Sequence, residues 1–215
     1  MEPDLPDRER LISLHSSNLF DAHCRALRRL TDGPRMLPED PELIAESPLF
    51  VSFDPGAVPD VHWRNAPAAL MPYLRHTGSP HDLSHRLVDH YEARIPSNSV
   101  LRVAAALSER PMSKKAVLPI WRETDLFNEV TAPCLNYAWF RLKQHEVDAH
   151  FVMRACDIYT KFPANAVLFS SVLRELSNSL GKAVGRLDIF IDSAHIYRID
   201  ADSVRAFIAT QHAAA

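Results

Sequence analysis

Polar residues whose types could support chemistry gather in the second half of the sequence, between Cys134 and Tyr197. Arg154 follows Cys134 after twenty residues, Asn165 follows eleven later, and His195 comes thirty residues after Asn165. A cysteine acts as a nucleophile in its thiolate form, which a nearby cation such as an arginine favours. Taken alone, however, an unpaired cysteine is more often a small, buried apolar side chain.

The order and spacing of these residues resemble the thymidylate synthase family, in its cysteine-dependent form that acts on dUMP with 5,10-methylenetetrahydrofolate. The matching elements are Cys134, Arg154-Ala155-Cys156-Asp157, Asn165 shortly after a proline, and His195-Ile196-Tyr197. The resemblance is clear over residues 91–199 and poor before them. It implies that Cys134 adds to C6 of a pyrimidine ring, which makes C5 nucleophilic toward a one-carbon donor.

The resemblance also implies roles for the other matching residues. Arg154 would bind a phosphate beside the thiolate, and Asn165 would read the N3 and O4 edge of the base. An amide can donate to O4 and accept from N3–H, which suits uracil. The alternative for Asn165 is a bond to its own helix backbone. Two further residues, Tyr91 and Asp157, match catalytic positions, whereas the pair His195 and Tyr197 matches residues that contact the sugar.

Further cations could complete an anion site. Lys114 and Lys115 stand where the family carries paired arginines, which reach the phosphate of the neighbouring subunit in a homodimer. Lysine supplies the charge without the bidentate fork of arginine, and a solvated pair at a strand edge is the alternative. Arg35, in a Gly-Pro-Arg loop, is a candidate for one more phosphate ligand. Trp121 matches a family tryptophan, with core packing as the alternative.

The sequence departs from the family pattern at several positions. Leu135 replaces the histidine that usually follows the nucleophile, Ala155 replaces a serine, and Glu92 replaces the glycine after the matching tyrosine. Residues 67–74 contain no carboxylate, although the family carries a glutamate in that region. General acid–base catalysis of this kind raises the reaction rate about 10²–10⁴-fold. The chain also ends eighteen residues after Tyr197, before the family's tail that closes over the folate.

We therefore predict a diverged transferase that moves a methyl or hydroxymethyl group to C5 of a uracil-type nucleotide, in specialised or modified-nucleotide metabolism. Methylenetetrahydrofolate is the expected donor. Two alternatives remain open. The same fold and Cys134 could act on a different small anionic substrate without folate, or the chain could be a non-catalytic nucleotide-binding relative.

The composition narrows the class of protein. The 215 residues carry a net charge of -3, which argues against a dedicated nucleic-acid binder. No apolar run approaches the roughly eighteen residues of a membrane span, and three widely spaced cysteines favour a reduced, cytoplasmic protein. His81 and His85 have the spacing of a zinc pair on a helix, but no third ligand accompanies them. We predict no metal site and a single domain over residues 1–215.

The hydrophobic pattern predicts an α+β fold in which helices cover a mainly antiparallel or mixed sheet. The resemblance implies that this sheet is large and twisted. Residues 135–142 and 146–153 should form a hairpin, and residues 163–180 the clearest helix, ended by Gly181. A loose arm is expected at 1–14 and a loop at 33–48. The other expected helices are 17–30, 65–76, 79–91, 98–109 and 203–210, and the other expected strands are 49–53, 115–121 and 187–191.

Overall fold

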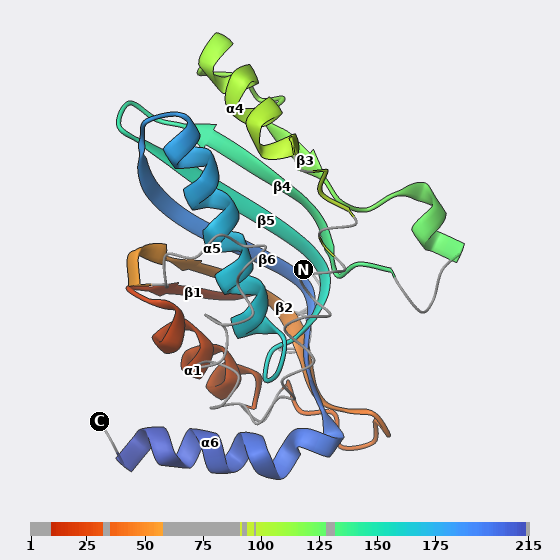
Figure 1. The fold of residues 1–215 in the computed structure, drawn as a ribbon. Helices are drawn as coiled ribbons and strands as arrows, with labels where there is room; N and C mark the ends of the chain where they lie inside the picture. Colours follow the sequence, from red (N-terminus) through yellow and green to blue (C-terminus); the bar gives the residue numbers. More distant parts are fainter. Residues whose placement is uncertain are drawn as a thin grey trace, which may run out of the picture.

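A six-stranded mixed sheet forms the centre of the molecule, and α1, α5 and α4 lie along one of its faces (Figure 1). The computed structural model describes residues 10–31, 35–57, 91, 94–96, 98–127 and 132–213, with the side chains of 211–213 left aside. Its strands are β1 (Ile12–Ser16), β2 (Leu43–Phe53), β3 (Val117–Pro119), β4 (Leu135–Leu142), β5 (Glu146–Asp157) and β6 (Ala183–Tyr197). Its helices are α1 (Leu19–Leu30), α4 (Ser99–Glu109), α5 (Phe162–Ser179) and α6 (Ala201–Ala213), with short 3-10 turns η3 (Pro55–Ala57), η5 (Glu123–Phe127) and η6 (Arg198–Asp200).

The strand order β1-β2-β6-β5-β4-β3 brings distant parts of the sequence to one end of the sheet. β5 and β6 are parallel, and their register sets Asp157 opposite His195. β4 is antiparallel to β5, and Leu135 faces Met153. The start of β4 therefore lies beside the last residues of β5 and β6, so the segments that begin with Cys134 and end with Tyr197 meet there.

The core lies between this sheet and α5. Phe151 of β5 stacks on Phe169 of α5, with ring centroids 4.2 Å apart and planes within 7° of parallel. Pro163 occupies the first turn of α5, where its missing N–H costs nothing. Gly181 follows the helix with a φ of 62°, a conformation that glycine adopts without strain. The predicted helix and its glycine stop are confirmed.

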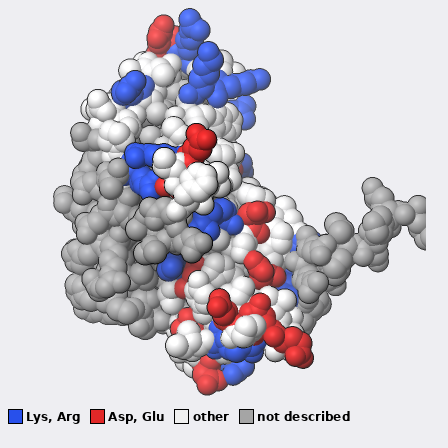
Figure 2. Space-filling model, turned by 90° about the vertical axis from the view of Figure 1, so that its right-hand side faces the viewer, with Lys and Arg blue, Asp and Glu red and all other residues white. Residues whose placement is uncertain are grey.

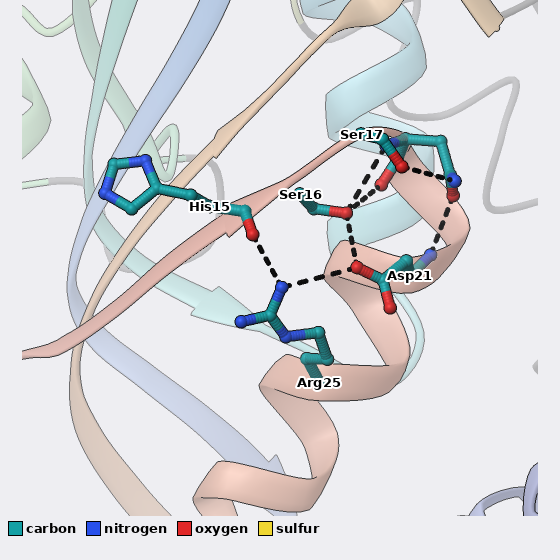
Figure 3. Close-up of polar contacts among 6 residues, drawn as sticks. His15, Ser16, Ser17, Asp21 and Arg25 are labelled. Atoms are coloured by element: carbon teal, nitrogen blue, oxygen red, sulfur yellow. Dashed lines mark hydrogen bonds and ion pairs between the residues drawn. The ribbon is translucent and has the colours of Figure 1, made fainter.

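A capped corner joins β1 to α1 (Figure 3). The Asn18 side chain accepts a bond from the Asp21 amide at 2.9 Å, and the Ser16 hydroxyl donates to the Asp21 carboxylate at 2.6 Å. Arg25 donates to the backbone oxygen of His15. The His15 ring points away from Ser16 and packs against Phe50, so these residues form a structural cap and do not pair as a nucleophile and base.

His23 of α1 is buried and bonds the Ile158 carbonyl through Nε2 at 2.9 Å. Burial lowers the pKa of His23 from 6.5 to about 4. In the unfolded chain His23 takes up a proton below pH 6.5, whereas the folded chain resists protonation until about pH 4. The unfolded state thus binds more protons in this window, and the native state loses stability as the pH falls through it.

We expect His23→Gln, which keeps a donor but does not titrate, to flatten this pH dependence. Wild-type protein should lose up to about 3 kcal/mol more unfolding free energy than the variant between pH 7 and pH 4, since each pKa unit corresponds to about 1.4 kcal/mol. Urea titrations across this range measure the difference. Parallel curves for the two proteins would show that His23 does not cause the loss.

A polar cluster occupies the sheet face opposite α5. Asp188 of β6 is 3% exposed and accepts a bond from Ser52 of β2 at 2.6 Å and a contact from His150 Nδ1 of β5 at 3.1 Å. The Trp139 ring lies 5.1 Å from that of His150. Burial acts to raise the pKa of Asp188, but the bonds from His150 and Ser52 outweigh it and the pKa is lowered. The cluster links three neighbouring strands.

The α+β class and mixed sheet are confirmed, as are the hairpin of β4 and β5 and the helix α4. Two expectations were wrong: β1 begins at Ile12, within the predicted arm, and β2 begins at Leu43, within the predicted loop. β3 is shorter than its predicted strand, whereas β6 and α6 are longer. The predicted helices 65–76 and 79–91 lie almost wholly outside the described residues. In the part of the chain that is described, no helix is long and apolar enough to cross a membrane.

Candidate functional site

Cys134 stands directly before β4, at the end of the sheet where β5 and β6 also finish. It is half-buried, and its carbonyl accepts the Arg154 amide at 2.9 Å. Pro133 precedes it and is itself buried. The segment that carries the thiol is therefore bonded to β5 next to Leu135, the first residue of the β4 ladder.

Arg154 is exposed on β5, and its guanidinium is held beside the segment of Cys134. Its Nε donates to the Pro133 carbonyl at 3.1 Å and Nη2 donates to that of Ala132 at 3.3 Å. The guanidinium carbon also lies 5.4 Å from the centre of the Trp121 ring. An arginine has five N–H donors, so these bonds fix the group and leave donors for an anion.

Tyr91 lies in the interior next to the same thiol. It is 3% exposed. Burial raises the pKa of its hydroxyl well above the usual value, and the neighbouring Cys134 and Cys156 add to the increase, while the Leu135 backbone and Arg154 act in the opposite direction. The hydroxyl therefore keeps its proton at neutral pH and can serve as a hydrogen-bond donor.

Asn165 lies in the first turn of α5 and is 1% exposed. Its Nδ2 donates to Cys156 Sγ at 3.6 Å, whereas its Oδ1 is buried and has no hydrogen-bond partner in the described part of the chain. The side chain thus bonds a thiol and not its own helix backbone. A buried acceptor without a partner is costly, and a ligand N–H would satisfy it.

Cys156 is a member of this site that sequence reasoning did not single out. It is 1% exposed, and burial raises the pKa of its thiol well above the usual value, with Cys134 and Asp157 as further causes. It remains a neutral thiol that orients the Asn165 amide. Its position in the Arg-x-Cys-Asp segment was visible, but its contact with a helix nine residues later was not.

Asp157 holds the turn between β5 and α5. Its carboxylate accepts the Tyr159 amide at 3.0 Å and the Thr160 amide at 3.1 Å, together with the Thr160 hydroxyl. It is 3% exposed. These bonds give Asp157 a structural role, because they hold the turn that leads into α5, where Asn165 lies. A catalytic role for Asp157 stays a prediction.

His195 and Tyr197 lie at the end of β6 on one side of the strand, as their spacing predicted. Their ring centroids are 5.0 Å apart. The backbone oxygen of His195 accepts the Ile158 amide at 2.9 Å, which ties β6 to the turn after β5. His195 Nδ1 lies 3.1 Å from the Ser193 carbonyl, so Nε2 is the ring atom left for other partners.

The remaining candidate cations are not brought to Cys134 within this chain. Lys114 and Lys115 are exposed on the turn before β3, at the edge of the sheet. Arg35 is partly buried next to Met36, which bridges to β2. Across the described ranges, no hydrogen bond or ion pair joins these three side chains to Cys134 or Arg154. Residues 67–74, His81 and His85 lie outside the described ranges. Within those ranges, no group of His, Cys, Asp or Glu side chains could hold a metal.

Comparison with known proteins identifies the family of the chain. The family model of thymidylate synthase matches residues 56–215. Over 107 residues, 49% of this chain, the sequence is 30% identical to a thymidylate synthase of Symbiobacterium thermophilum and covers 38% of it. Over 131 residues, 61% of this chain, it is 24% identical to thymidylate synthase 1/2 of Encephalitozoon cuniculi and covers 43% of it. The matches thus span about two fifths of the length of these relatives. The family match over most of the chain shows that the chain belongs to the thymidylate synthase family as a diverged member.

Proposed function

We propose that this protein transfers a one-carbon group, methyl or hydroxymethyl, to C5 of a uracil-type nucleotide. One observation carries the proposal: the half-buried thiol of Cys134 has a fixed guanidinium beside its segment and a buried phenol near it. The neighbouring Cys156 thiol bonds an amide whose oxygen has no partner among the described residues. These groups supply, in turn, a nucleophile, an anion ligand, a proton donor and a base-reading side chain.

The chemistry would begin with the Cys134 sulfur. It adds to C6 of the ring, and the C5–C6 electrons move to C5 and O4, so C5 becomes able to attack a one-carbon donor. Arg154 would bind the phosphate, Asn165 the base, and His195 with Tyr197 the sugar. Tyr91 would donate a hydrogen bond to a water or to O4 near C5. C5 attacks the methylene carbon of the donor, the C5 proton is lost, and the folate nitrogen departs to leave an exocyclic methylene. Hydride from the tetrahydrofolate then gives the methyl product and dihydrofolate, whereas water gives the hydroxymethyl product. The sulfur leaves C6 in the same step, which restores the ring.

Methylenetetrahydrofolate is the donor that we propose as second substrate. Residues 67–74, where the family carries a glutamate, are outside the described residues, so the donor side rests on family membership. We also propose a single domain over residues 1–215 and a homodimer in which Lys114 and Lys115 approach the partner's phosphate.

Release of tritium from C5 tests the proposal. Wild-type protein is mixed with dUMP, UMP, dCMP or CMP carrying tritium at C5, with and without methylenetetrahydrofolate. Folate-dependent release from a uracil nucleotide is expected. Release without folate would show addition at C6 alone and would favour a reaction without that donor. Absence of both release and binding for all four nucleotides would contradict the proposal.

Asn165→Asp should change which base is accepted. A carboxyl group in place of the amide can accept from the amino group of cytosine, whereas it repels O4 of uracil. We expect kcat/KM for the uracil nucleotide to fall about 10²-fold and the ratio of cytosine to uracil turnover to rise, since a mispaired polar group costs roughly 1–3 kcal/mol. Asn178→Asp, at the exposed end of the same helix, is the matched control. An unchanged base preference in Asn165→Asp would rule out contact between this side chain and the ring.

A further inference from the structure

A second place for an anion lies between α4 and β3. A cavity of about 550 Å³ opens there, a size typical of small-ligand sites. Four of its lining side chains are cationic: Arg94, Arg102, Lys115 and Arg122. Figure 2 shows Lys and Arg side chains gathered at the end of the molecule where α4 lies in Figure 1.

One carboxylate offsets these four charges within the described part of the chain. Asp125 is 4% exposed and pairs with Arg94 at 2.7 Å, and the same oxygen accepts the Arg122 amide at 2.7 Å. Burial acts to raise the pKa of Asp125, but Arg94 and the Arg122 backbone outweigh it and the pKa is lowered. No ion pair in the described ranges joins Arg102 or Lys115 to an acid. The cavity thus holds a positive excess that an anion would relieve.

The start of α4 adds to this field. Ser99, in the first turn, lines the cavity. The Asn98 side chain makes no capping bond, and the first turn contains no acidic residue. The partial positive charge of a helix N-terminus favours an anion at this position. The four cationic side chains and the start of α4 therefore direct positive charge into one space.

Apolar side chains also line the cavity, and one of them borders the proposed nucleotide site. Val103, Val117 and Leu118 line the cavity, as does Trp121. Arg154 lies 5.4 Å from the Trp121 ring, so this tryptophan separates the cavity from the guanidinium beside Cys134. The cavity can accept an organic group as well as a charged one.

We propose that this cavity binds a small ligand carrying a phosphate chain, of the nucleoside triphosphate class, at a site separate from the one at Cys134. The phosphate chain contacts Arg102, Arg122 and the start of α4. The organic part packs against the apolar side chains that line the cavity. A ligand bound here holds Lys115 on its own subunit and keeps it from a partner's phosphate. Binding in this cavity does not depend on the activity proposed for Cys134, whereas its effect on Lys115 rests on the proposed homodimer.

Calorimetric titration of the full chain with inorganic triphosphate and with uridine triphosphate, at constant ionic strength, tests this site. We expect both to bind wild-type protein and to bind Arg102→Ala/Arg122→Ala at least about tenfold more weakly, since charge-assisted bonds are lost. Both arginines are exposed, so the core is preserved; the single variant Arg102→Gln gives the same test if the double variant unfolds. Tighter binding of uridine triphosphate identifies a nucleotide ligand, and equal binding identifies the phosphate chain alone.

Two further variants make the result decisive. Arg110→Ala removes the same charge at the other end of α4, outside the cavity, and should change affinity by less than about twofold. Arg154→Ala should retain binding. The proposal is overturned if wild-type protein binds neither ligand, or if Arg110→Ala weakens binding as much as the double variant. It is also overturned if Arg154→Ala abolishes binding that the double variant keeps.

Discussion

Cys134→Ala is expected to lower C5 tritium release by about 10³-fold or more, the scale on which enzymes lose activity with their nucleophile. Without a sulfur to add at C6, the ring has no route to a nucleophilic C5. The loss should appear in kcat, while nucleotide affinity changes little, because the Arg154 side chain bonds the carbonyls of residues 132 and 133 and not the thiol. Tritium release and equilibrium binding, measured on the same preparation, separate the two effects.

Cys24→Ala is the matched control. Cys24 is a buried thiol on α1, where burial raises its pKa. The same atom is removed away from the site, so release should stay near the wild-type rate. Release by Cys134→Ala above about a tenth of the wild-type rate would show that this thiol is not the nucleophile. A loss of nucleotide binding in the same variant would instead point to a role of Cys134 in binding.

Phe151→Ala should lower the free energy of unfolding by about 3–5 kcal/mol, the usual cost of removing a buried aromatic ring. Phe151 is 2% exposed and stacks on Phe169. The cavity would lie between β5 and α5, the two elements that carry Arg154 and Asn165. Denaturant unfolding measures the loss, and nucleotide affinity should fall with it as the two elements loosen.

Phe127→Ala removes the same ring from a solvent-exposed position on η5, where Phe127 is 87% exposed. Its unfolding free energy should stay within about 0.5 kcal/mol of wild type. Equal losses in the two variants would show that burial between β5 and α5 is not what Phe151 contributes.

The elements that sequence alone predicted are those with a local signal. α5 combines a long apolar pattern, a proline in its first turn and Gly181 at its end. β4 and β5 form neighbours joined by three residues, so their pairing is local as well. The β1 strand was missed because its five residues pair in parallel with Leu49 to Phe53, a partner far along the chain.

The same distinction, between local signals and contacts of distant segments, applies to the candidate site. The spacing from Cys134 to Tyr197 predicted which residues meet, and the register of β5 with β6 explains why. The bond between Asn165 and Cys156 depends on how α5 leaves the turn at Asp157, which periodicity does not describe. The pairing of Arg94 with Asp125 joins segments 31 residues apart, and no motif indicated it. The roles assigned to the site residues stay predictions until the variants are assayed.

The buried Asp188 has a consequence for how this sequence can change over evolutionary time. Besides the Arg186 guanidinium of its own strand, at 3.1 Å, its carboxylate is bonded by Ser52 and His150, from the strands on either side. Loss of one partner leaves a buried charge without full compensation, which typically costs about 3–5 kcal/mol. Substitutions at these three positions are therefore expected to be epistatic: a change tolerated in one genetic background would be purged in another. Lineages should replace the trio as a unit, by steps that keep the carboxylate paired or remove it first.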